Sequence, residues 1–165
     1  MHSFVEASSP PTPEAIRIEL VTPDVTRPLR KQFLMQHRTL DDLARSDGHY
    51  PDAGYYVART SDGHILGTAS TRPERPPWAS DTPNAWRIRG MVTVPQMRGQ
   101  GIGFRLLQAV IAHASARGAR LVWCNVRSEA IPFYRRAGLR TTGDSWQDPD
   151  TGPHIAMYRD LREPP

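Results

Sequence analysis

The sequence contains one cysteine, Cys124, among its 165 residues. A lone cysteine excludes a disulfide within the chain, and the scarcity of cysteine fits the reducing cytoplasm. No stretch approaches the roughly 20 consecutive apolar residues of a membrane-spanning helix. The N-terminus lacks a basic region followed by an apolar run, which is the pattern of a signal peptide. We therefore expect a cytoplasmic protein with no membrane partner.

Lysine is also scarce: Lys31 is the only one, so arginine supplies 20 of the 21 basic residues. The net charge is +4, but the arginines are scattered among acidic residues and form no basic block. Zinc-ligand spacings and aromatic RNA-binding motifs are absent as well. The sequence thus predicts neither a metal site nor a nucleic-acid partner, whereas a basic rim suits an anionic cofactor.

The length of the chain fits one domain with a sizeable core. Residues 1–14 include the run Ser8-Ser9-Pro10-Pro11-Thr12-Pro13 and are predicted to form a flexible, proline-rich tail. A single domain is therefore expected over residues 15–162.

Apolar periodicity and turn residues predict a mixed α/β order of elements. The predicted strands cover residues 16–20, 55–58, 65–69, 86–94, 121–125, 139–142 and 154–159. The predicted helices cover residues 23–36, 101–117 and a short stretch from Ser128 to before Gly138, with another short helix considered at 40–45. Pro28 is expected in a first helical turn and Ser128 as an N-cap. Residues 72–84 and 143–153 are expected to be loops.

The most informative feature is the run Arg98-Gly99-Gln100-Gly101-Ile102-Gly103. It follows an apolar stretch at residues 91–94 and precedes an apolar helical pattern at 104–116. Amide groups at a helix N-terminus, together with the helix dipole, bind phosphate oxygens. Arg98 adds a two-point phosphate donor. The run therefore predicts a strand–loop–helix unit that holds a pyrophosphate.

The spacing excludes two common phosphate-binding loops. A P-loop needs four residues between its glycines and then Gly-Lys-Ser/Thr, and Lys31 is far upstream. A dinucleotide fingerprint needs a third glycine, where this chain has Leu106, and an acidic residue roughly 20 positions further on. The chain has Ala119, Arg120 and Leu121 there.

The pattern Arg-x-x-Gly-x-Gly after Val92, Val94 and Pro95 is similar to the acetyl-CoA motif of the GCN5-related N-acetyltransferases. A second block, residues 121–127 followed by Phe133-Tyr134 and Gly138-Leu139, resembles the same family. This resemblance implies an α/β fold whose mixed, mostly antiparallel sheet splays between strands four and five. It also implies an N-acetyltransferase with acetyl-CoA as the donor.

The resemblance further implies the residues that bind the donor. Backbone groups of Val92 and Val94 would bond its pantetheine arm as an added strand does, and an amide near Val92 would face the thioester oxygen. The implied cofactor-binding residues are Val92, Thr93, Val94, Arg98, Gly99, Gln100, Gly101, Ile102, Gly103, Phe104 and Phe133. Tyr134 matches the family's tyrosine and would protonate the leaving thiolate, since a phenol pKa of ~10 lies near that of an alkyl thiol.

The general base is left open, because the strand at residues 86–94 has no carboxylate where histone-type members carry a glutamate. A water chain, His154 and Asp81 are the alternatives. Arg127 stands where many members carry an asparagine, and it would contact a phosphate or the acceptor, or be a surface charge. Cys124, within a predicted buried strand, is expected to be inert.

We expect the acceptor to be a small-molecule primary amine that attacks directly in a ternary complex. A protein or peptide acceptor and a catalytically silent acyl-CoA sensor are the alternatives, and a homodimer is left open. Trp78 and Trp146 lie in predicted loops that could line the acceptor pocket. The acidic residues in and beside the polar segment 37–51 would favour a polyamine. They are Asp41, Asp42, Asp47 and Asp52.

Overall fold

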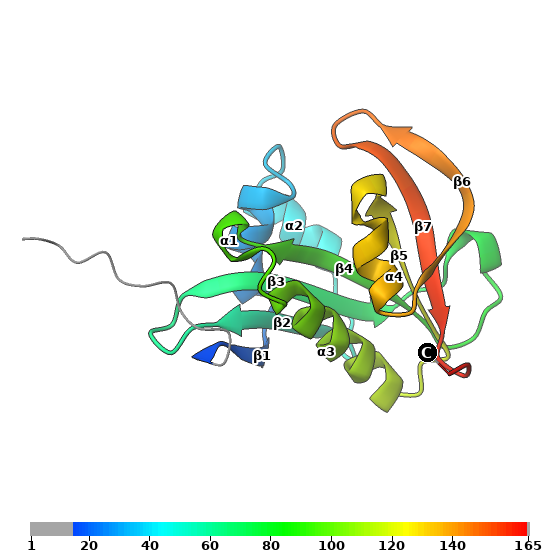
Figure 1. Cartoon of the computed structure of the whole chain (residues 1–165), viewed down its shortest axis with the longest axis horizontal. Helices are drawn as coiled ribbons and strands as arrows, with labels where there is room; N and C mark the ends of the chain where they lie inside the picture. Colours follow the sequence, from blue (N-terminus) through cyan, green and yellow to red (C-terminus); the bar gives the residue numbers. More distant parts are fainter. Residues whose placement is uncertain (1–14, 165) are drawn as a thin grey trace, which may run out of the picture.

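The computed structural model describes residues 15–164 and shows one sheet of seven strands flanked by helices (Figure 1). The tail predicted at residues 1–14 lies outside the described residues. The strands lie in the order β1-β2-β3-β4-β5-β7-β6, and only β4 and β5 run parallel. Their bounds are β1 (Arg17–Val21), β2 (Gly54–Arg59), β3 (Ile65–Pro73), β4 (Ala85–Thr93), β5 (Leu121–Arg127), β6 (Arg140–Asp148) and β7 (Gly152–Asp160). The predicted mixed α/β fold is confirmed.

The helices follow the predicted order, and the short helix considered at residues 40–45 is present as α2. They are α1 (Pro23–Phe33), α2 (Leu40–Asp47), α3 (Ile102–Ala116) and α4 (Ile131–Arg136), with 3₁₀ turns η2 (Pro77–Ala79), η3 (Pro95–Met97) and η4 (Ser128–Ala130). None of the helices in the described part of the chain is long and apolar enough to cross a membrane.

The side chains of β4 alternate between the two faces of the sheet, and the two faces differ in character. Trp86 and Ile88 alternate with Arg87 and Arg89, and successive strand side chains point to opposite faces. Trp86 and Ile88 belong to the apolar core. Arg89 instead reaches Ser46 of α2 on the other face.

The helix α3 covers the apolar face. Its side chains Leu106, Leu107 and Val110 are fully buried at the three- and four-residue spacing of an amphipathic helix. The packing is close at Gly67 of β3, where an added Cβ would lie 2.7 Å from the carbonyl oxygen of Val92 and 2.9 Å from Leu106 Cδ1. This packing fixes the helix whose N-terminus carries the glycine run.

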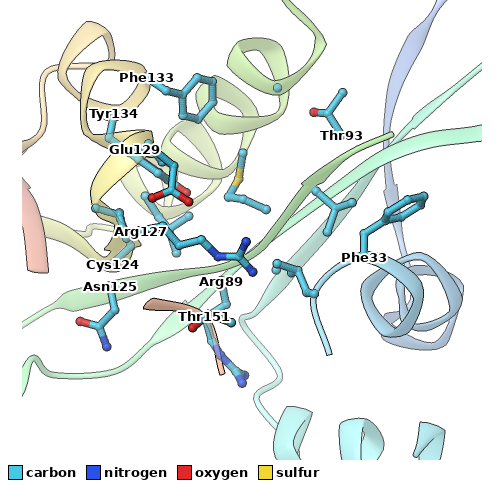
Figure 2. A pocket seen from close by; sticks show the side chains of 18 of the residues that line it. Phe33, Arg89, Thr93, Cys124, Asn125, Arg127, Glu129, Phe133, Tyr134 and Thr151 are labelled. Atoms are coloured by element: carbon cyan, nitrogen blue, oxygen red, sulfur yellow. The ribbon is translucent and has the colours of Figure 1, made fainter. Parts of the chain in front are cut away.

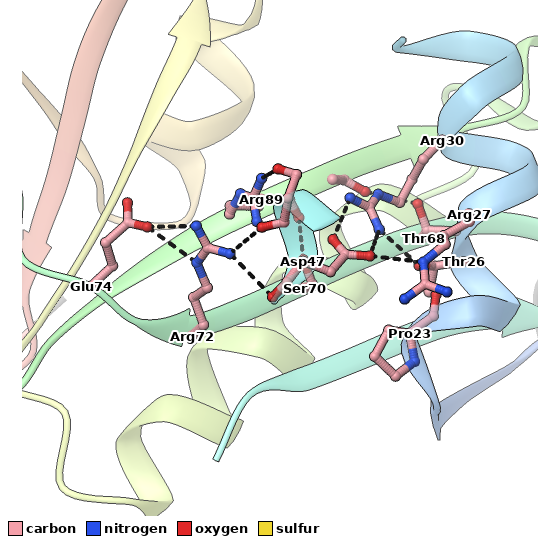
Figure 3. Close-up of polar contacts among 12 residues, drawn as sticks. Pro23, Thr26, Arg27, Arg30, Asp47, Thr68, Ser70, Arg72, Glu74 and Arg89 are labelled. Atoms are coloured by element: carbon pink, nitrogen blue, oxygen red, sulfur yellow. Dashed lines mark hydrogen bonds and ion pairs between the residues drawn. The ribbon is translucent and has the colours of Figure 1, made fainter. Parts of the chain in front are cut away.

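The other face is held by buried charged groups (Figure 3). Asp47 Oδ1 accepts a hydrogen bond from Arg30 Nη2 at 2.8 Å, which joins α2 to α1. Arg72 of β3 donates to the carbonyl of Ser46 at 3.0 Å and pairs with Glu74 at 2.7 Å. These bonds position α2 against the sheet.

The strands β4 and β5 are paired only at one end. Their register pairs are Ala85–Leu121, Trp86–Val122 and Arg87–Trp123. Beyond these pairs the two strands run on without pairing to each other, to Thr93 and Arg127. The sheet therefore divides between strands four and five, as predicted.

The strand β4 also carries a bulge. In its register with β3, Gly90 and Met91 stand opposite Ala69 alone. Gly90 has φ +64°, a conformation that favours glycine, and an added Cβ would make a tight contact of 3.3 Å with Arg30 Nε. A bulge bends its strand and leaves one residue outside the ladder, and here that happens beside the gap between β4 and β5.

The first predicted helix is shorter than expected and differs in one detail. α1 ends at Phe33 rather than at residue 36, and Pro28 lies in its interior rather than in its first turn. Proline cannot donate to the carbonyl four residues earlier, that of Asp24. Both residues are exposed, so water can bond that carbonyl.

Three other predictions were wrong, namely the loop at residues 143–153, the N-cap at Ser128 and the loop at residues 72–84. β6 extends to Asp148 and β7 begins at Gly152, so most of the predicted loop 143–153 is strand. Residues 143–147 are exposed on the outermost strand, and backbone pairing rather than apolar alternation defines it.

Ser128 makes no capping bond, because the chain passes through η4 before α4 begins at Ile131. The predicted loop 72–84 contains the end of β3 and η2.

Candidate active site

A cleft of about 980 Å³ opens where β4 and β5 separate. This volume lies within the roughly 300–1,000 Å³ of small-molecule sites. One end, the glycine-loop end, is formed by residues 97–99 and 101–104. The other is the arginine end, named for Arg30, Arg87, Arg89 and Arg127, which line it together with the last turn of α1 and the β6–β7 hairpin. Figure 2 shows side chains that line this cleft.

The glycine-loop end presents backbone amides. Within the described residues, the amides from Gly99 to Phe104 donate to no acceptor, and the first bond of α3 runs from Arg105 to the Gly101 carbonyl at 3.1 Å. Gly99 and Gly101 have φ +82° and +81°, a conformation that favours glycine. An added Cβ at either position would meet no protein atom within 4 Å. The loop is therefore open to a ligand, and its amides suit phosphate oxygens.

Most residues predicted to contact the cofactor line this cleft. They are Val92, Thr93, Arg98, Gly99, Gly101, Ile102, Gly103, Phe104 and Phe133. Val94 and Gln100 do not line it. The amide of Val94 donates to the carbonyl of Leu66 at 2.9 Å, and Gln100 is exposed in the loop.

Tyr134 projects from α4 and also lines the cleft. Its ring packs edge-on against Phe133, with centroids 5.0 Å apart. The hydroxyl makes no hydrogen bond to any described residue. Burial, with a smaller effect of nearby Cys124, raises the pKa of Tyr134 well above its ordinary 10. The phenol is therefore protonated at neutral pH and holds a proton for a leaving group, although the raised pKa makes it a weaker acid than a free phenol.

Cys124 lies on β5 beneath the cleft and is 3% exposed. Burial raises the pKa of its thiol far above the ordinary range, although the charge of Arg87 opposes this shift. The thiol is therefore protonated at neutral pH. A protonated, buried thiol is a poor nucleophile, in accord with the inert role expected for it.

Of the two side chains considered as bases, only His154 lines the cleft, while Asp81 is exposed outside it. His154 Nδ1 lies 2.9 Å from the carbonyl oxygen of Gly152, which can only accept, so this contact places a proton on Nδ1. The other ring nitrogen is 3.4 Å from the Thr151 hydroxyl. The ring stacks on Trp146 with centroids 5.9 Å apart.

Two ideas about the acceptor pocket change. Trp78 packs edge-on against Trp123, with ring centroids 5.3 Å apart, and does not line the cleft. Trp146, which lies on β6 rather than in a loop, does line it. The acidic cluster does not form a groove for a polyamine. Asp47 is buried against Arg30, and Asp42 accepts from the amide of Thr39 at 3.1 Å as a helix cap.

Arg89 was not among the predicted site residues, although the structure places it at the cleft. The available signal was the alternation of Arg87 and Arg89 with Trp86 and Ile88 along β4. This alternation indicates that two arginines share one face of a central strand. Within residues 15–164, no group of three His, Cys, Asp or Glu side chains is placed to hold a metal ion.

Comparisons with known proteins agree with this geometry. The model of the acetyltransferase (GNAT) family matches residues 19–139. The chain is 26% identical over 147 residues to the uncharacterized N-acetyltransferase YitI of Bacillus subtilis (strain 168), covering 89% of this chain and 97% of that protein.

One further match is a relative in sequence, and another is a solved structure. An L-methionine sulfoximine/L-methionine sulfone acetyltransferase of Pseudomonas paraeruginosa is 30% identical over 123 residues, covering 72% of this chain and 65% of that protein. The solved structure of a GCN5-related N-acetyltransferase from Kribbella flavida is similar in fold, with a TM-score of 0.69 and 22% identity. That match covers 91% of this chain and 100% of the other.

Proposed function

The chain belongs to the acetyltransferase (GNAT) family, and from this membership we propose that it transfers an acetyl group from acetyl-CoA to the primary amine of a small molecule. The observation that carries the proposal is the row of amides from Gly99 to Phe104, which donate to no described residue at one end of the cleft.

The residues present fit acetyl-CoA as the donor. The amides of the glycine-loop end would receive the pyrophosphate, with Arg98 at the rim. The pantetheine arm would lie in the gap between β4 and β5, where β4 lacks a partner on that side and can bond an extended ligand. Acetyl-CoA supplies the activated acyl group. The protein binds it, orients it and moves protons around it.

We assign the general acid to Tyr134. Its phenol is protonated, lines the cleft and donates to no described residue, so it is available to a leaving thiolate. An amide of the bulged segment near Val92 would donate to the thioester oxygen as negative charge develops there. Cys124 has no part in this scheme, and the amine attacks directly in a ternary complex.

The proton of the attacking amine would leave through His154 or through water. His154 lines the cleft, and its Nε2 is held only by a long contact with Thr151. Asp81 lies outside the cleft, so we no longer consider it as the base.

A small acceptor is supported by the shape of the site. The arginine end lies between the last turn of α1 and the β6–β7 hairpin, so both sides of the cleft are bounded by protein. One relative carries the name of an acetyltransferase for L-methionine sulfoximine and L-methionine sulfone, which are small amines. A peptide acceptor and a silent acyl-CoA sensor remain the rival functions.

The test combines binding and turnover. Acetyl-CoA at 100 times its dissociation constant should stabilise the fold by about 2.7 kcal/mol, visible as a raised melting temperature. CoA release is then followed with amino acids, polyamines, aminoglycosides, arylamines and short peptides. Release with a small amine establishes the proposed function, and release with peptides alone transfers it to the first rival. A melting shift with no release from any amine supports the sensor.

A further inference from the structure

The arginine end of the cleft holds more positive charge than its neighbours neutralise. Arg30 is paired with Asp47 at 2.8 Å, and Arg87 with Glu74 at 2.8 Å. These pairs use the buried carboxylate of Asp47 and the half-buried carboxylate of Glu74. Arg89 lies on the same strand as Arg87, and no carboxylate among the described residues lies within ion-pair distance of it.

The side chain of Arg89 leaves most of its hydrogen-bond donors unused. Within the described residues it bonds only through Nη2, which donates to Ser46 Oγ at 3.0 Å. Burial, together with the charges of Arg72, Arg87 and Arg30, lowers the pKa of Arg89 to about 10. The guanidinium is therefore still charged at neutral pH, in a setting that favours an added negative charge.

Arg127 supplies a second unpaired guanidinium from the opposite strand. It ends β5, lies in register with His154 of β7 and is half-buried. Figure 2 shows its side chain extending into the cleft toward β4. No hydrogen bond or ion pair joins it to any residue of the described chain. The two strands that open to form the cleft thus each contribute one uncompensated arginine.

The acidic residues that line the cleft do not compensate these arginines. Asp148 Oδ1 accepts from the amides of Asp150 and Thr151 at 2.9 and 3.1 Å, so it closes the β6–β7 turn. Asp150 and Glu129 are exposed at the rim and pair with no described arginine. A charge that is partly removed from water without a partner is costly. A bound anion would relieve that cost at both arginines.

We propose that the acceptor is an amino acid or similar amine that carries a carboxylate, and that Arg89 and Arg127 bind this carboxylate. The inference rests on the proposed function and names its substrate class. Guanidinium groups bind carboxylates through paired hydrogen bonds, and β4 and β5 would grip the acceptor from both sides. An apolar wall of Phe33, Leu34 and Met35 also lines this end and suits an apolar side chain. A polyamine or aminoglycoside would meet like charge here.

The experiment compares each L-amino acid with its own carboxamide, which keeps the amine and side chain but removes the negative charge. The rate of CoA release is measured for the wild type and for Arg127→Gln, Arg89→Gln and Arg89→Lys. Arg135→Gln is the matched control, since Arg135 is an exposed arginine of α4 outside the cleft. Acetyl-CoA binding by each variant, followed by melting, confirms that it is folded.

We expect the wild type to prefer the best amino acid over its amide by at least tenfold in kcat/KM. Arg127→Gln and Arg89→Gln should each lower kcat/KM for the amino acid about 10- to 100-fold and leave the amide unchanged. Arg89→Lys keeps the positive charge but loses the planar guanidinium that forms paired hydrogen bonds, so its kcat/KM should lie between those of Arg89→Gln and the wild type. Arg135→Gln should match the wild type. Equal use of acid and amide, or a preference for a polyamine, overturns the inference and leaves the proposed function standing.

If no amine is acetylated, binding decides the inference independently of activity. Melting is then measured with CoA plus an N-acetyl-L-amino acid, and with CoA plus its amide. Stabilisation by the acid alone, lost in Arg127→Gln, supports the carboxylate site while the proposed function fails. No difference between acid and amide across the amino-acid series overturns the inference.

Discussion

Asp47 and Arg30 form a two-point ion pair, with Nη2–Oδ1 at 2.8 Å and Nη1–Oδ2 at 3.0 Å. Their side chains are 1% and 4% exposed, so the pair is almost completely removed from water. Because Arg30 belongs to α1 and Asp47 ends α2, this contact fixes the polar segment that borders the cleft.

Replacing Asp47 with asparagine should strongly destabilise the fold. Removal of one partner of a buried ion pair leaves the other charge uncompensated, at a cost of about 3–5 kcal/mol. Urea denaturation of Asp47→Asn should show this loss. Asp81→Asn, at an exposed acid, is the control and should unfold with the wild type. Equal stability of Asp47→Asn and wild type would show that the pair contributes nothing net.

The stability should fall when the pH drops below about 6.5, because His113 is buried as a neutral ring. Burial, opposed by a hydrogen bond with the Asp52 carbonyl, lowers the pKa of His113 below its ordinary 6.5. The unfolded chain therefore binds this proton more readily than the native protein. The stability is complete above the unfolded pKa and declines as acid is added.

Chemical denaturation between about pH 7.5 and pH 5 measures this slope. His113→Gln should flatten it, even though the variant also loses the 2.9 Å contact with Tyr56 and starts from a lower stability. A slope that survives in His113→Gln would assign the titration to other groups.

Replacing Tyr134 with phenylalanine should lower kcat about 10- to 100-fold, because the leaving thiolate loses its acid. The ring stays in place, so acetyl-CoA binding measured by melting should be unchanged. Tyr158→Phe, on β7 outside the cleft, is the control with the same chemical change. Full activity of Tyr134→Phe would reject the assignment of the acid.

Substitution of two glycines at opposite ends of α3 distinguishes an effect on ligand binding from an effect of backbone strain. Gly101 and Gly118 have φ +81° and +83°, and an added Cβ meets nothing within 4 Å at either. Substitution by leucine should cost each variant a similar roughly 1–2 kcal/mol of stability. Only Gly101→Leu should weaken acetyl-CoA binding, by at least tenfold, because its side chain would occupy the phosphate cradle. Equal affinities would place the pyrophosphate elsewhere.

Features with a strong local cause were predictable from the sequence. The glycine run marks the start of α3 because positive φ at Gly99 and Gly101 leaves few other residue types suitable. The end of the strand before it follows from the apolar stretch at residues 91–94, and the buried β5 follows from a near-continuous apolar run. These elements hold most of the residues proposed for acetyl-CoA.

The arginine end of the cleft was not predictable in the same way, because which of its arginines are neutralised depends on contacts between distant segments. Whether Arg89 is neutralised depends on which carboxylates the fold delivers to Arg30 and Arg87, and these come from α2 and the end of β3. No spacing along the chain records that pairing. The extension of the edge strand β6 beyond residue 142 was missed for a related reason, because its partner is β7 and its exposed residues carry no apolar period.

The limited pairing of β4 with β5 has a mechanical consequence. Four strands on one side and three on the other are joined across the sheet through three residue pairs at one end. A small rotation about those pairs would widen or narrow the gap between β4 and β5 without breaking a backbone bond between the two strands, because none joins them beyond Arg87. The two halves of the sheet can thus adjust to the thickness of a ligand between them while each half stays intact.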